Sequence, residues 1–312
     1  MTETPNVILI GIEPKSPNID VPWSIEDSLI ELEELSRTAK LNVVYHLSQS
    51  RDLPDSRSYI GKGKVDELKS LIKSLHAEVV IADDELSPLQ QKTLETALEV
   101  KIMDRTALVL EIFASRAQTK EAKLQIELAQ LNYLLPRLTR MWTHLSRLGG
   151  GIGTRGPGET QLETDKRLIK TKLSYLKKEV AKVQKHRNTM REKRQDIPYL
   201  TAAIVGYTNA GKSTLLNTLC GSKIYAQDQL FATLDPTTRE LQLPNKESIL
   251  LTDTVGFIQK LPPHLVNAFR ATLEEVVVAD ILLHVVDVSH AKYKEMIRTS
   301  DAILSDLGAS TK

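Results

Sequence analysis

Short apolar runs alternate with helical patterns along the first third of the chain. Three runs rich in β-branched residues have the length of strands: Val7–Ile10, Asn42–Tyr45 and Glu78–Ile81. Segments with the apolar spacing of amphipathic helices separate or follow them: Ser24–Lys40, Val65–Leu75 and Pro88–Leu98. This alternation predicts a small parallel α/β sheet with crossover helices.

Two polar features of this first segment have more than one interpretation. Residues Gly61 to Lys64 (GKGK) open a predicted helix, where they form either an anion site or, as we prefer, a plain turn. Asp83 and Asp84 end a predicted strand. Ligands often bind at such an end, but solvated turn acids are the preferred interpretation.

Apolar residues in the middle of the chain follow a heptad spacing. The first stripe is Leu124, Leu128, Leu131, Leu135, Leu138, Trp142 and Leu145. The second is Leu162, Ile169, Leu173, Leu176, Val180, Val183 and Met190. Two such stripes joined by one loop predict a long antiparallel helical hairpin, with a kink at Pro136.

The last third opens with a strand, a glycine-containing loop and a helix. The apolar run Leu200–Val205 precedes the loop, and Thr214–Leu219 has helical character. The loop fits G-x-x-x-x-G-K-[ST], which wraps the phosphates of a nucleoside triphosphate when it lies between a strand and a helix. The predicted nucleotide-binding residues here are Gly206, Tyr207, Thr208, Asn209, Ala210, Gly211, Lys212, Ser213 and Thr214.

The chemistry of phosphate binding explains these residue types. Glycine at 206 and 211 lets the backbone approach the phosphates, and successive N–H groups form a positive concavity. Lys212 would supply a charge for the β and γ phosphates. The Ser213 hydroxyl is a predicted Mg²⁺ ligand. A turn that binds nothing is the less favoured interpretation.

A second acidic motif narrows the class of phosphate-loop protein. A predicted strand, Ser248–Thr252, is followed by Asp253-Thr254-Val255-Gly256. Asp253 could hold Mg²⁺ directly or through water, and the Gly256 N–H could meet the γ-phosphate. Thr233, in a predicted loop, is either a switch residue that closes onto the metal or an ordinary loop threonine. Further predicted nucleotide-binding residues are Phe231, Ala232, Thr233, Leu234, Asp235, Asp253, Thr254, Val255 and Gly256.

No catalytic side chain is assigned. Many Ras-like GTPases place a Gln that orients the attacking water after the glycine of the corresponding motif. Here Phe257 and Ile258 follow. Neither side chain can orient a water, so we expect slow intrinsic hydrolysis that a macromolecular partner accelerates.

Composition and charge divide the chain into three segments. Residues 1–118 carry 13 basic and 20 acidic residues (−7), residues 119–197 carry 18 and 8 (+10), and residues 198–312 carry 10 and 12 (−2). We expect an α/β domain at 1–118, a basic hairpin at 119–197 and a phosphate-loop G domain at 198–312. The single cysteine excludes a disulfide framework, and we recognise neither a signal peptide nor a membrane span.

The basic middle segment predicts contact with nucleic acid. Its second helix carries many lysines and arginines with few acids between them, which favours phosphate binding over a merely solvated face. Before it, residues 149–163 (GGGIGTRGPGETQLE) hold six glycines in their first ten positions, which suits a loop that orders on a partner. The predicted RNA-binding residues are Arg147, Gly151, Arg155, Lys170, Lys177, Lys185 and Arg187.

These motifs together resemble the Obg–HflX type of GTPases, and residues 149–163 most closely resemble the HflX family. The resemblance implies a GTP- and GDP-binding, Mg²⁺-dependent GTPase that binds the large ribosomal subunit and its RNA. It further implies that the protein can split or rescue stalled ribosomes. We expect a cytoplasmic monomer.

One family motif is missing from this sequence. Guanine is normally read by Asn-Lys-x-Asp after the predicted strand Ile281–Val288, and no such motif follows it; Asn245-Lys246 lacks the Asp and lies upstream. A predicted helix at Ala291–Leu307 is the last element, so we expect a G domain truncated at its C-terminal end. The alternative function is a catalytically impaired fragment that binds RNA or the ribosome; an ATPase using the first domain is less favoured.

Overall fold

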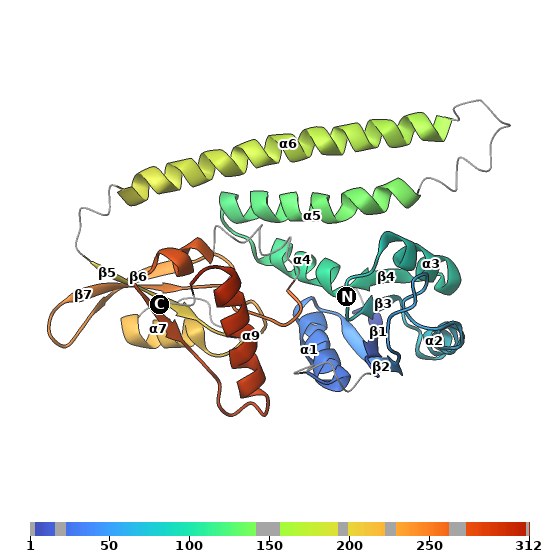
Figure 1. Cartoon of the computed structure of the whole chain (residues 1–312), viewed down its shortest axis with the longest axis horizontal. Coiled ribbons are helices and arrows are strands. Elements are labelled where there is room, and N and C mark those ends of the chain that lie inside the picture. Colours follow the sequence, from blue (N-terminus) through green and yellow to red (C-terminus); the bar gives the residue numbers. More distant parts are fainter. Residues whose placement is uncertain are drawn as a thin grey trace. The chain divides into compact units, whose positions relative to one another are not determined.

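The computed structural model describes residues 4–15, 23–141, 157–192, 199–221, 229–261, 273–309 and 312 (Figure 1). The chain divides into two compact units: unit 1 contains Met1–Ile112 and Gln130–Ser174, and unit 2 contains Phe113–Ala129 and Tyr175–Lys312. The elements in chain order are β1 (Asn6–Glu13), α1 (Ile25–Thr38), β2 (Asn42–Ser50), α2 (Lys62–Leu75), β3 (Val79–Ala82), α3 (Pro88–Leu98), β4 (Lys101–Asp104), α4 (Arg105–Arg116), α5 (Lys120–Met141), α6 (Pro157–Glu192), β5 (Leu200–Val205), α7 (Lys212–Cys220), β6 (Thr237–Gln242), β7 (Ser248–Asp253), β8 (Ile281–His284) and α9 (Tyr293–Asp306).

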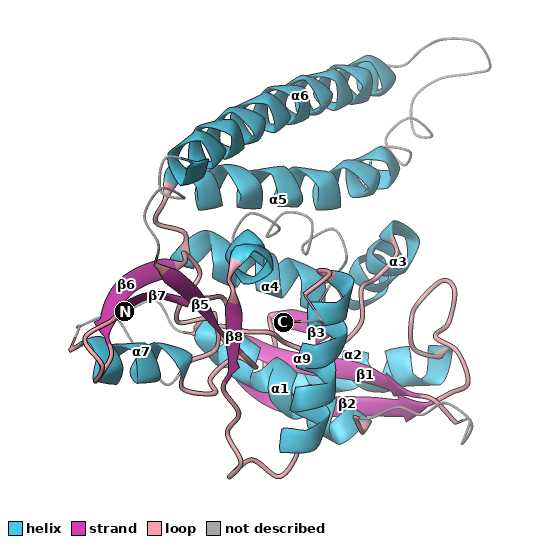
Figure 2. Cartoon of the chain, turned by 60° about the vertical axis from the view of Figure 1, so that its left-hand side comes forward, coloured by secondary structure: helices cyan, strands magenta, loops and turns pink. Residues whose placement is uncertain are grey.

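Unit 1 is built on a four-stranded parallel sheet with the order β2-β1-β3-β4, labelled in Figure 1. Figure 2 shows β1 and β2 of this sheet side by side. The central strand β1 is buried from Val7 to Ile12, as expected for a parallel strand covered on both faces. The predicted α/β class is therefore confirmed. The pattern did not reveal β4 and α4, because β4 is only four residues long and has a charged residue at each end.

The helices of this unit begin where their sequences provide caps. Ser24 and Ser87 each close a capping box, with Asp27 and Gln90 respectively, at the starts of α1 and α3. Helix α2 begins at Lys62, directly after Gly61, whose N–H donates to the Gln49 side chain at 2.8 Å. The GKGK segment is thus a helix start, as both interpretations assumed, and the preference for a plain turn over an anion site stays a prediction.

Arg105 joins three elements through buried ion pairs. Its guanidinium lies 2.5 Å from Oδ1 of Asp83 and 2.6 Å from Oε1 of Glu31, and it also donates to the Ser28 carbonyl oxygen. The expectation of a solvated turn acid is wrong for Asp83, whereas Asp84 is partly exposed. Asp83 is fully buried, and Asp84 accepts a hydrogen bond from the Tyr59 hydroxyl at 2.6 Å. A charged partner 22 positions along the chain makes that burial possible.

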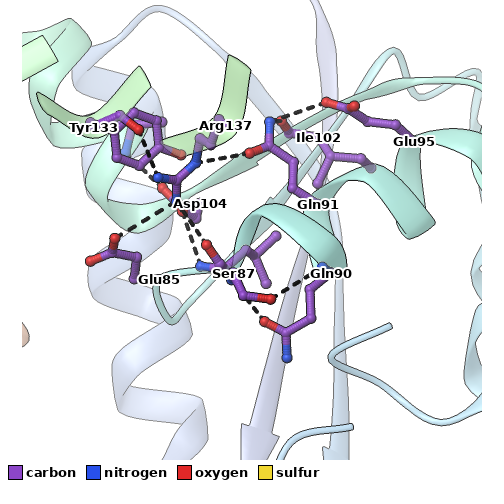
Figure 3. Close-up of polar contacts among 11 residues, drawn as sticks. Glu85, Ser87, Gln90, Gln91, Glu95, Ile102, Asp104, Tyr133 and Arg137 are labelled. Atoms are coloured by element: carbon purple, nitrogen blue, oxygen red, sulfur yellow. Dashed lines mark hydrogen bonds and ion pairs between the residues drawn. The ribbon is translucent and has the colours of Figure 1, made fainter. Parts of the chain in front are cut away.

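A second polar cluster attaches α5 to the α/β sheet within unit 1. Arg137 donates to the Leu86 carbonyl at 2.7 Å, to Asp104 at 3.1 Å and to Gln91 at 3.1 Å (Figure 3). Its guanidinium carbon lies 3.4 Å from the centroid of the Tyr133 ring. Burial raises the pKa of Asp104, although the hydrogen bond from the Ala107 N–H and the charge of Arg137 lower it. The buried carboxylate is therefore stabilised in part by this arginine.

The two long helices bury their apolar residues unequally. In α6, Leu173 and Leu176 are buried, as the heptad stripe predicts. In α5 the predicted leucines Leu124, Leu128, Leu131 and Leu135 are only half-buried. The buried stripe there consists of Ala122, Gln125, Ile126, Ala129, Tyr133 and Arg137. Tyr133 and Arg137 are buried because they belong to the polar cluster around Asp104.

Unit 2 contains the second sheet, with the order β6-β7-β5-β8. β5 pairs in parallel with β7 and β8, and β6 is antiparallel to β7. Ala202, Ile204, Leu216 and Leu251 form a fully buried core between β5, β7 and α7. This arrangement places the loops after β5 and β7 at the same edge of the sheet. No helix within the described residues is long and apolar enough to cross a membrane.

Candidate nucleotide and metal site

The glycine-containing loop joins β5 to α7, as predicted. Gly206 has φ 144°, and a Cβ there would lie 2.2 Å from the carbonyl oxygen of Val285, just after β8. Gly211 is the N-cap of α7, so the first N–H groups of that helix face the loop. The loop thus has the backbone geometry of an anion-binding helix start.

Lys212 is buried at the base of this loop. Its Nζ donates to the carbonyl oxygens of Tyr207, at 2.7 Å, and Gly206, at 3.2 Å. Burial lowers the pKa of this amine to about 8, although the nearby Asp253 raises it. A buried ammonium is stabilised by anionic oxygens, so the position suits a phosphate.

Three oxygen-bearing side chains from separate segments meet beside Lys212. The Ser213 hydroxyl lies 2.6 Å from Oδ2 of Asp253 and 2.6 Å from the Thr233 hydroxyl. The other Asp253 oxygen, Oδ1, is buried and has no hydrogen-bond partner among the residues that the structure describes. Burial raises the pKa of this carboxyl, while Ser213, Thr233 and Lys212 lower it. Hard oxygens around an unsatisfied carboxylate oxygen fit a small divalent cation such as Mg²⁺.

The segment after β7 packs directly on the phosphate loop. The Thr208 N–H donates to the Phe257 carbonyl at 2.7 Å, and the Phe257 N–H donates to the Gly206 carbonyl at 3.1 Å. A Cβ on Gly256 would lie 2.5 Å from Cα of Thr208. The same Cβ would lie 2.8 Å from Nζ of Lys212, so glycine is required at 256.

The two residues that follow Gly256 are core residues. Phe257 and Ile258 are each 1% exposed. The Gln259 N–H donates to the Tyr207 hydroxyl at 2.9 Å. Both side chains are apolar as well as buried, so neither can orient a water, as the sequence analysis expects.

We call residues 229–235 the switch loop. Leu230, Phe231 and Leu234 are buried, and the Phe231 N–H donates to the Thr208 hydroxyl at 2.9 Å. The Asp235 carboxylate accepts hydrogen bonds from residues 118 and 119. The loop is therefore fixed to the phosphate loop at one position and to the start of α5 at another.

A pocket lies between these segments, entirely within unit 2. It is lined by Thr208, Asn209, Gly211, Lys212, Ser213, Thr214, Gln229, Phe231, Ala232, Thr233, Thr254 and Gly256. Most are predicted nucleotide-binding residues. The lining does not include the predicted residues Gly206, Tyr207, Ala210, Leu234, Asp235, Asp253 and Val255. Gln229 was missed, and its only signal was its position four residues before Thr233.

The predicted RNA-binding residues lie mostly on α6 or outside the described residues. Lys170, Lys177 and Lys185 are exposed on α6. Arg187 belongs to the same helix, but its side chain is outside the description. Arg147, Gly151 and Arg155 lie outside the described residues altogether. Lys182 pairs with Glu179 at 2.7 Å, so acids offset part of this basic face.

Three protein-family models match consecutive parts of the chain. Residues 26–114 match a "GTP-binding GTPase N-terminal" region, 116–194 a "GTP-binding GTPase Middle Region" and 201–310 a "50S ribosome-binding GTPase" domain. A structure from Sulfolobus solfataricus, a GTP-binding protein in complex with GDP, covers 98% of this chain and 78% of its own with a TM-score of 0.51 and 26% identity. The sheet, the phosphate loop and these matches define a P-loop GTPase.

The sequence comparisons identify the family. The GTPase HflX of Caldanaerobacter subterraneus is 54% identical over 91% of this chain and 66% of its own length. Those of Alkalihalophilus pseudofirmus and Escherichia coli are 51% and 45% identical, over 97% and 91% of this chain and 71% and 67% of theirs. The chain belongs to the HflX family of GTPases and spans about two thirds of the length of these relatives. The predicted family is confirmed.

Proposed function

We propose that the protein binds GTP with Mg²⁺, hydrolyses it, and uses the nucleotide state to control association with the large ribosomal subunit. The main support for nucleotide binding is that the Ser213 hydroxyl lies next to Thr233 and Asp253, beside the buried Lys212. The partner is supported by the basic α6 and by the family description that matches residues 201–310. A cytoplasmic location and a monomeric state stay predictions.

Each part of the site has a role in this proposal. The N–H groups at the start of α7 hold phosphate oxygens, and Lys212 neutralises the β and γ phosphates. Ser213, Thr233 and Asp253 would hold Mg²⁺, which supplies charge neutralisation between the phosphates when bound. The Gly256 N–H donates to the γ-phosphate.

Hydrolysis by the isolated protein should be slow. A water-orienting side chain is missing directly after Gly256, since Phe257 and Ile258 are buried in the core. Orientation of water contributes strongly to phosphoryl transfer in this class, and partners often complete the site. We propose that the ribosome supplies the missing group.

Nucleotide titration of the full chain tests the central proposal. Ser213→Ala should weaken GTP binding about tenfold or more when Mg²⁺ is present and only slightly in EDTA, because the lost contact is to the metal. Thr218→Ala is the matched control: it lies on the same helix, is exposed, and bonds only its own helix backbone through its hydroxyl. Equal weakening with and without Mg²⁺ would contradict the assignment of Ser213.

Ribosome co-sedimentation separates the proposal from its alternative. A factor controlled by GTP should sediment with large subunits more strongly with a non-hydrolysable GTP analogue than with GDP. Retained sedimentation without any nucleotide binding would favour the impaired RNA- or ribosome-binding fragment. Discrimination between GTP and ATP in the same titrations tests guanine specificity directly.

A further inference from the structure

A carboxylate joins the switch loop to the start of α5. Asp235 accepts hydrogen bonds from the N–H groups of Gln118 and Thr119, at 3.0 and 3.2 Å, and from the Thr119 hydroxyl at 2.5 Å. The Thr119 hydroxyl also accepts from the Ala122 N–H at 3.1 Å, so Thr119 acts as the N-cap of α5. The positive end of a helix further stabilises a carboxylate at this position.

Two more contacts join the same pair of segments. The rings of Phe113 and Phe231 meet edge to face with centroids 4.6 Å apart, and both side chains are buried. Arg116 donates a hydrogen bond to the Gln229 side chain. Residues 113–119 and the switch loop belong to the same compact unit. They are in contact at three places along these residues: at Phe113, at Arg116 and at residues 118–119. We call residues 113–119 the brace.

The brace contacts the switch loop on both sides of Thr233. Gln229 and Phe231, before Thr233, line the nucleotide pocket, and Asp235 follows two residues after it. Between these attachments, the Thr233 hydroxyl lies 2.6 Å from that of Ser213. A loop fixed at both ends presents its central hydroxyl with less loss of chain entropy than a free loop would.

We propose that the brace is a positioning element of the nucleotide site, with Thr119 and Asp235 as its central pair. It holds the switch loop in the arrangement in which Thr233 stands beside Ser213 and Asp253. This inference rests on the proposed function, because it assigns Thr233 to the metal of a bound triphosphate. It adds that residues outside the second sheet, at the start of α5, set the affinity for that state.

The positioning role predicts a selective effect on nucleotide affinity. A contact that forms only when the switch loop holds Thr233 beside Ser213 favours ligands that need this closed arrangement. It leaves the affinity for other ligands unaffected. A triphosphate with Mg²⁺ needs Thr233, whereas a diphosphate has no γ-phosphate to order the loop. By reciprocity, a triphosphate should strengthen the contact between Asp235 and the start of α5.

Substitutions at the central pair test the inference on the full chain. Thr119→Ala and Asp235→Asn should each weaken binding of a non-hydrolysable GTP analogue with Mg²⁺ by about tenfold, the loss expected for a hydrogen bond to a charged group. GDP affinity should change less than about twofold, and the Mg²⁺ concentration needed for analogue binding should rise. The double variant should be no weaker than the single variants, since both remove the same contact.

Two variants control for a merely structural effect. Thr119→Ser keeps the hydroxyl and should bind like the parent protein. Thr171→Ala removes an exposed hydroxyl on α6 that bonds only the Arg167 carbonyl, and it should change nothing. An equal loss of GDP and analogue affinity, or unchanged affinity for both in a folded Asp235→Asn protein, would overturn the inference. A parent protein that binds no guanine nucleotide would instead overturn the proposed function.

Hydrogen exchange gives a readout without mutation. The N–H groups of Gln118 and Thr119 donate to Asp235, so their exchange should slow when the GTP analogue and Mg²⁺ are added. GDP should slow it much less. The same protection with both nucleotides would contradict the coupling even if the affinities behave as expected.

Discussion

The Ser213 hydroxyl donates to Oδ2 of Asp253 across 2.6 Å, although 40 positions separate them in the chain. The contact arises because β5 and β7 are parallel neighbours, so the segments that follow them leave the sheet at the same edge. It leaves Oδ1 of Asp253 buried, with no hydrogen-bond partner in the described part of the chain. A cation at this oxygen would remove the cost of that burial.

Asp253→Asn should therefore uncouple nucleotide binding from Mg²⁺. Loss of the charge is expected to weaken Mg²⁺-dependent GTP binding about tenfold to a hundredfold, while binding in EDTA changes little. Calorimetric titration with and without Mg²⁺ measures both. Mg²⁺ dependence equal to that of the parent protein would show that Asp253 is not part of the metal site.

Lys212 should make nucleotide affinity depend on pH. Burial lowers the pKa of its amine from 10.5 to about 8 in the folded protein. The folded state thus loses this proton before the unfolded state does, so the stability of the free protein should rise from about pH 8 to about pH 10.5. Phosphate binding needs the ammonium and should be full below about pH 8, then weaken by up to about tenfold per pH unit above it.

The control for this titration is Lys212→Arg. A guanidinium stays charged over this pH range. The nucleotide affinity that the variant retains should therefore not fall above about pH 8. Titration of the guanine base affects both proteins alike and cancels in the comparison. Parallel pH profiles for the two proteins would contradict the role of the amine.

Phe257→Gln should not create a faster enzyme. The side chain at 257 is 1% exposed, so an amide there would be buried in the core and would not face the phosphates. We expect a loss of about 3 kcal/mol in the free energy of unfolding and no gain in single-turnover hydrolysis. Urea denaturation and rapid-quench assays measure the two effects, and a clear rate increase would refute the placement of this residue.

Arg105→Leu should strongly destabilise the α/β domain. The substitution leaves the carboxylates of Asp83 and Glu31 buried without the positive charge of Arg105, at a cost of about 3 to 5 kcal/mol in the free energy of unfolding. Buried carboxyls that lack a nearby positive charge have raised pKa values. At acidic pH the variant and the parent protein should therefore differ less in their free energy of unfolding. Arg37→Leu is the control: that arginine is exposed in its pairs with Glu33 and Glu34, and its loss should cost about 1 kcal/mol or less.

The exposed lysines of α6 should determine how salt affects RNA binding. Replacing Lys170, Lys177 and Lys185 with Gln should reduce the log–log salt slope for ribosomal RNA by about 2 to 3, if each contacts one phosphate. Lys40, Lys73 and Lys101 are exposed elsewhere and form the matched control set. Equal slopes for both triple variants would remove the electrostatic argument for α6.

The sequence predicted what depends on local pattern. Strand-and-helix alternation located most of both sheets, and the motif types placed Ser213, Thr233 and Asp253 in one candidate site before their geometry was known. Their roles at that site stay predictions, as does the division into three segments. The expected Ile281–Val288 strand is shorter, since β8 ends at His284.

Features that depend on residues far apart in the chain could not be predicted from the sequence. Asp83 looked like a solvated turn acid because Arg105, which allows its burial, lies in another element. In α5, a heptad of leucines concealed the stripe that is actually buried, since Tyr133 and Arg137 face the sheet of unit 1. The contact of Thr119 with Asp235 spans 116 positions and has no local signal.

Gly206 has a consequence for how such loops are recognised. Its missing Cβ accommodates the Val285 carbonyl, so the requirement comes from sheet packing and would persist in a homologue that had lost all affinity for nucleotides. A glycine at the first motif position is then poor evidence for ligand binding in divergent sequences. Lys212 and Ser213 are the diagnostic positions, because nothing in the packing of the sheet demands an amine or a hydroxyl there.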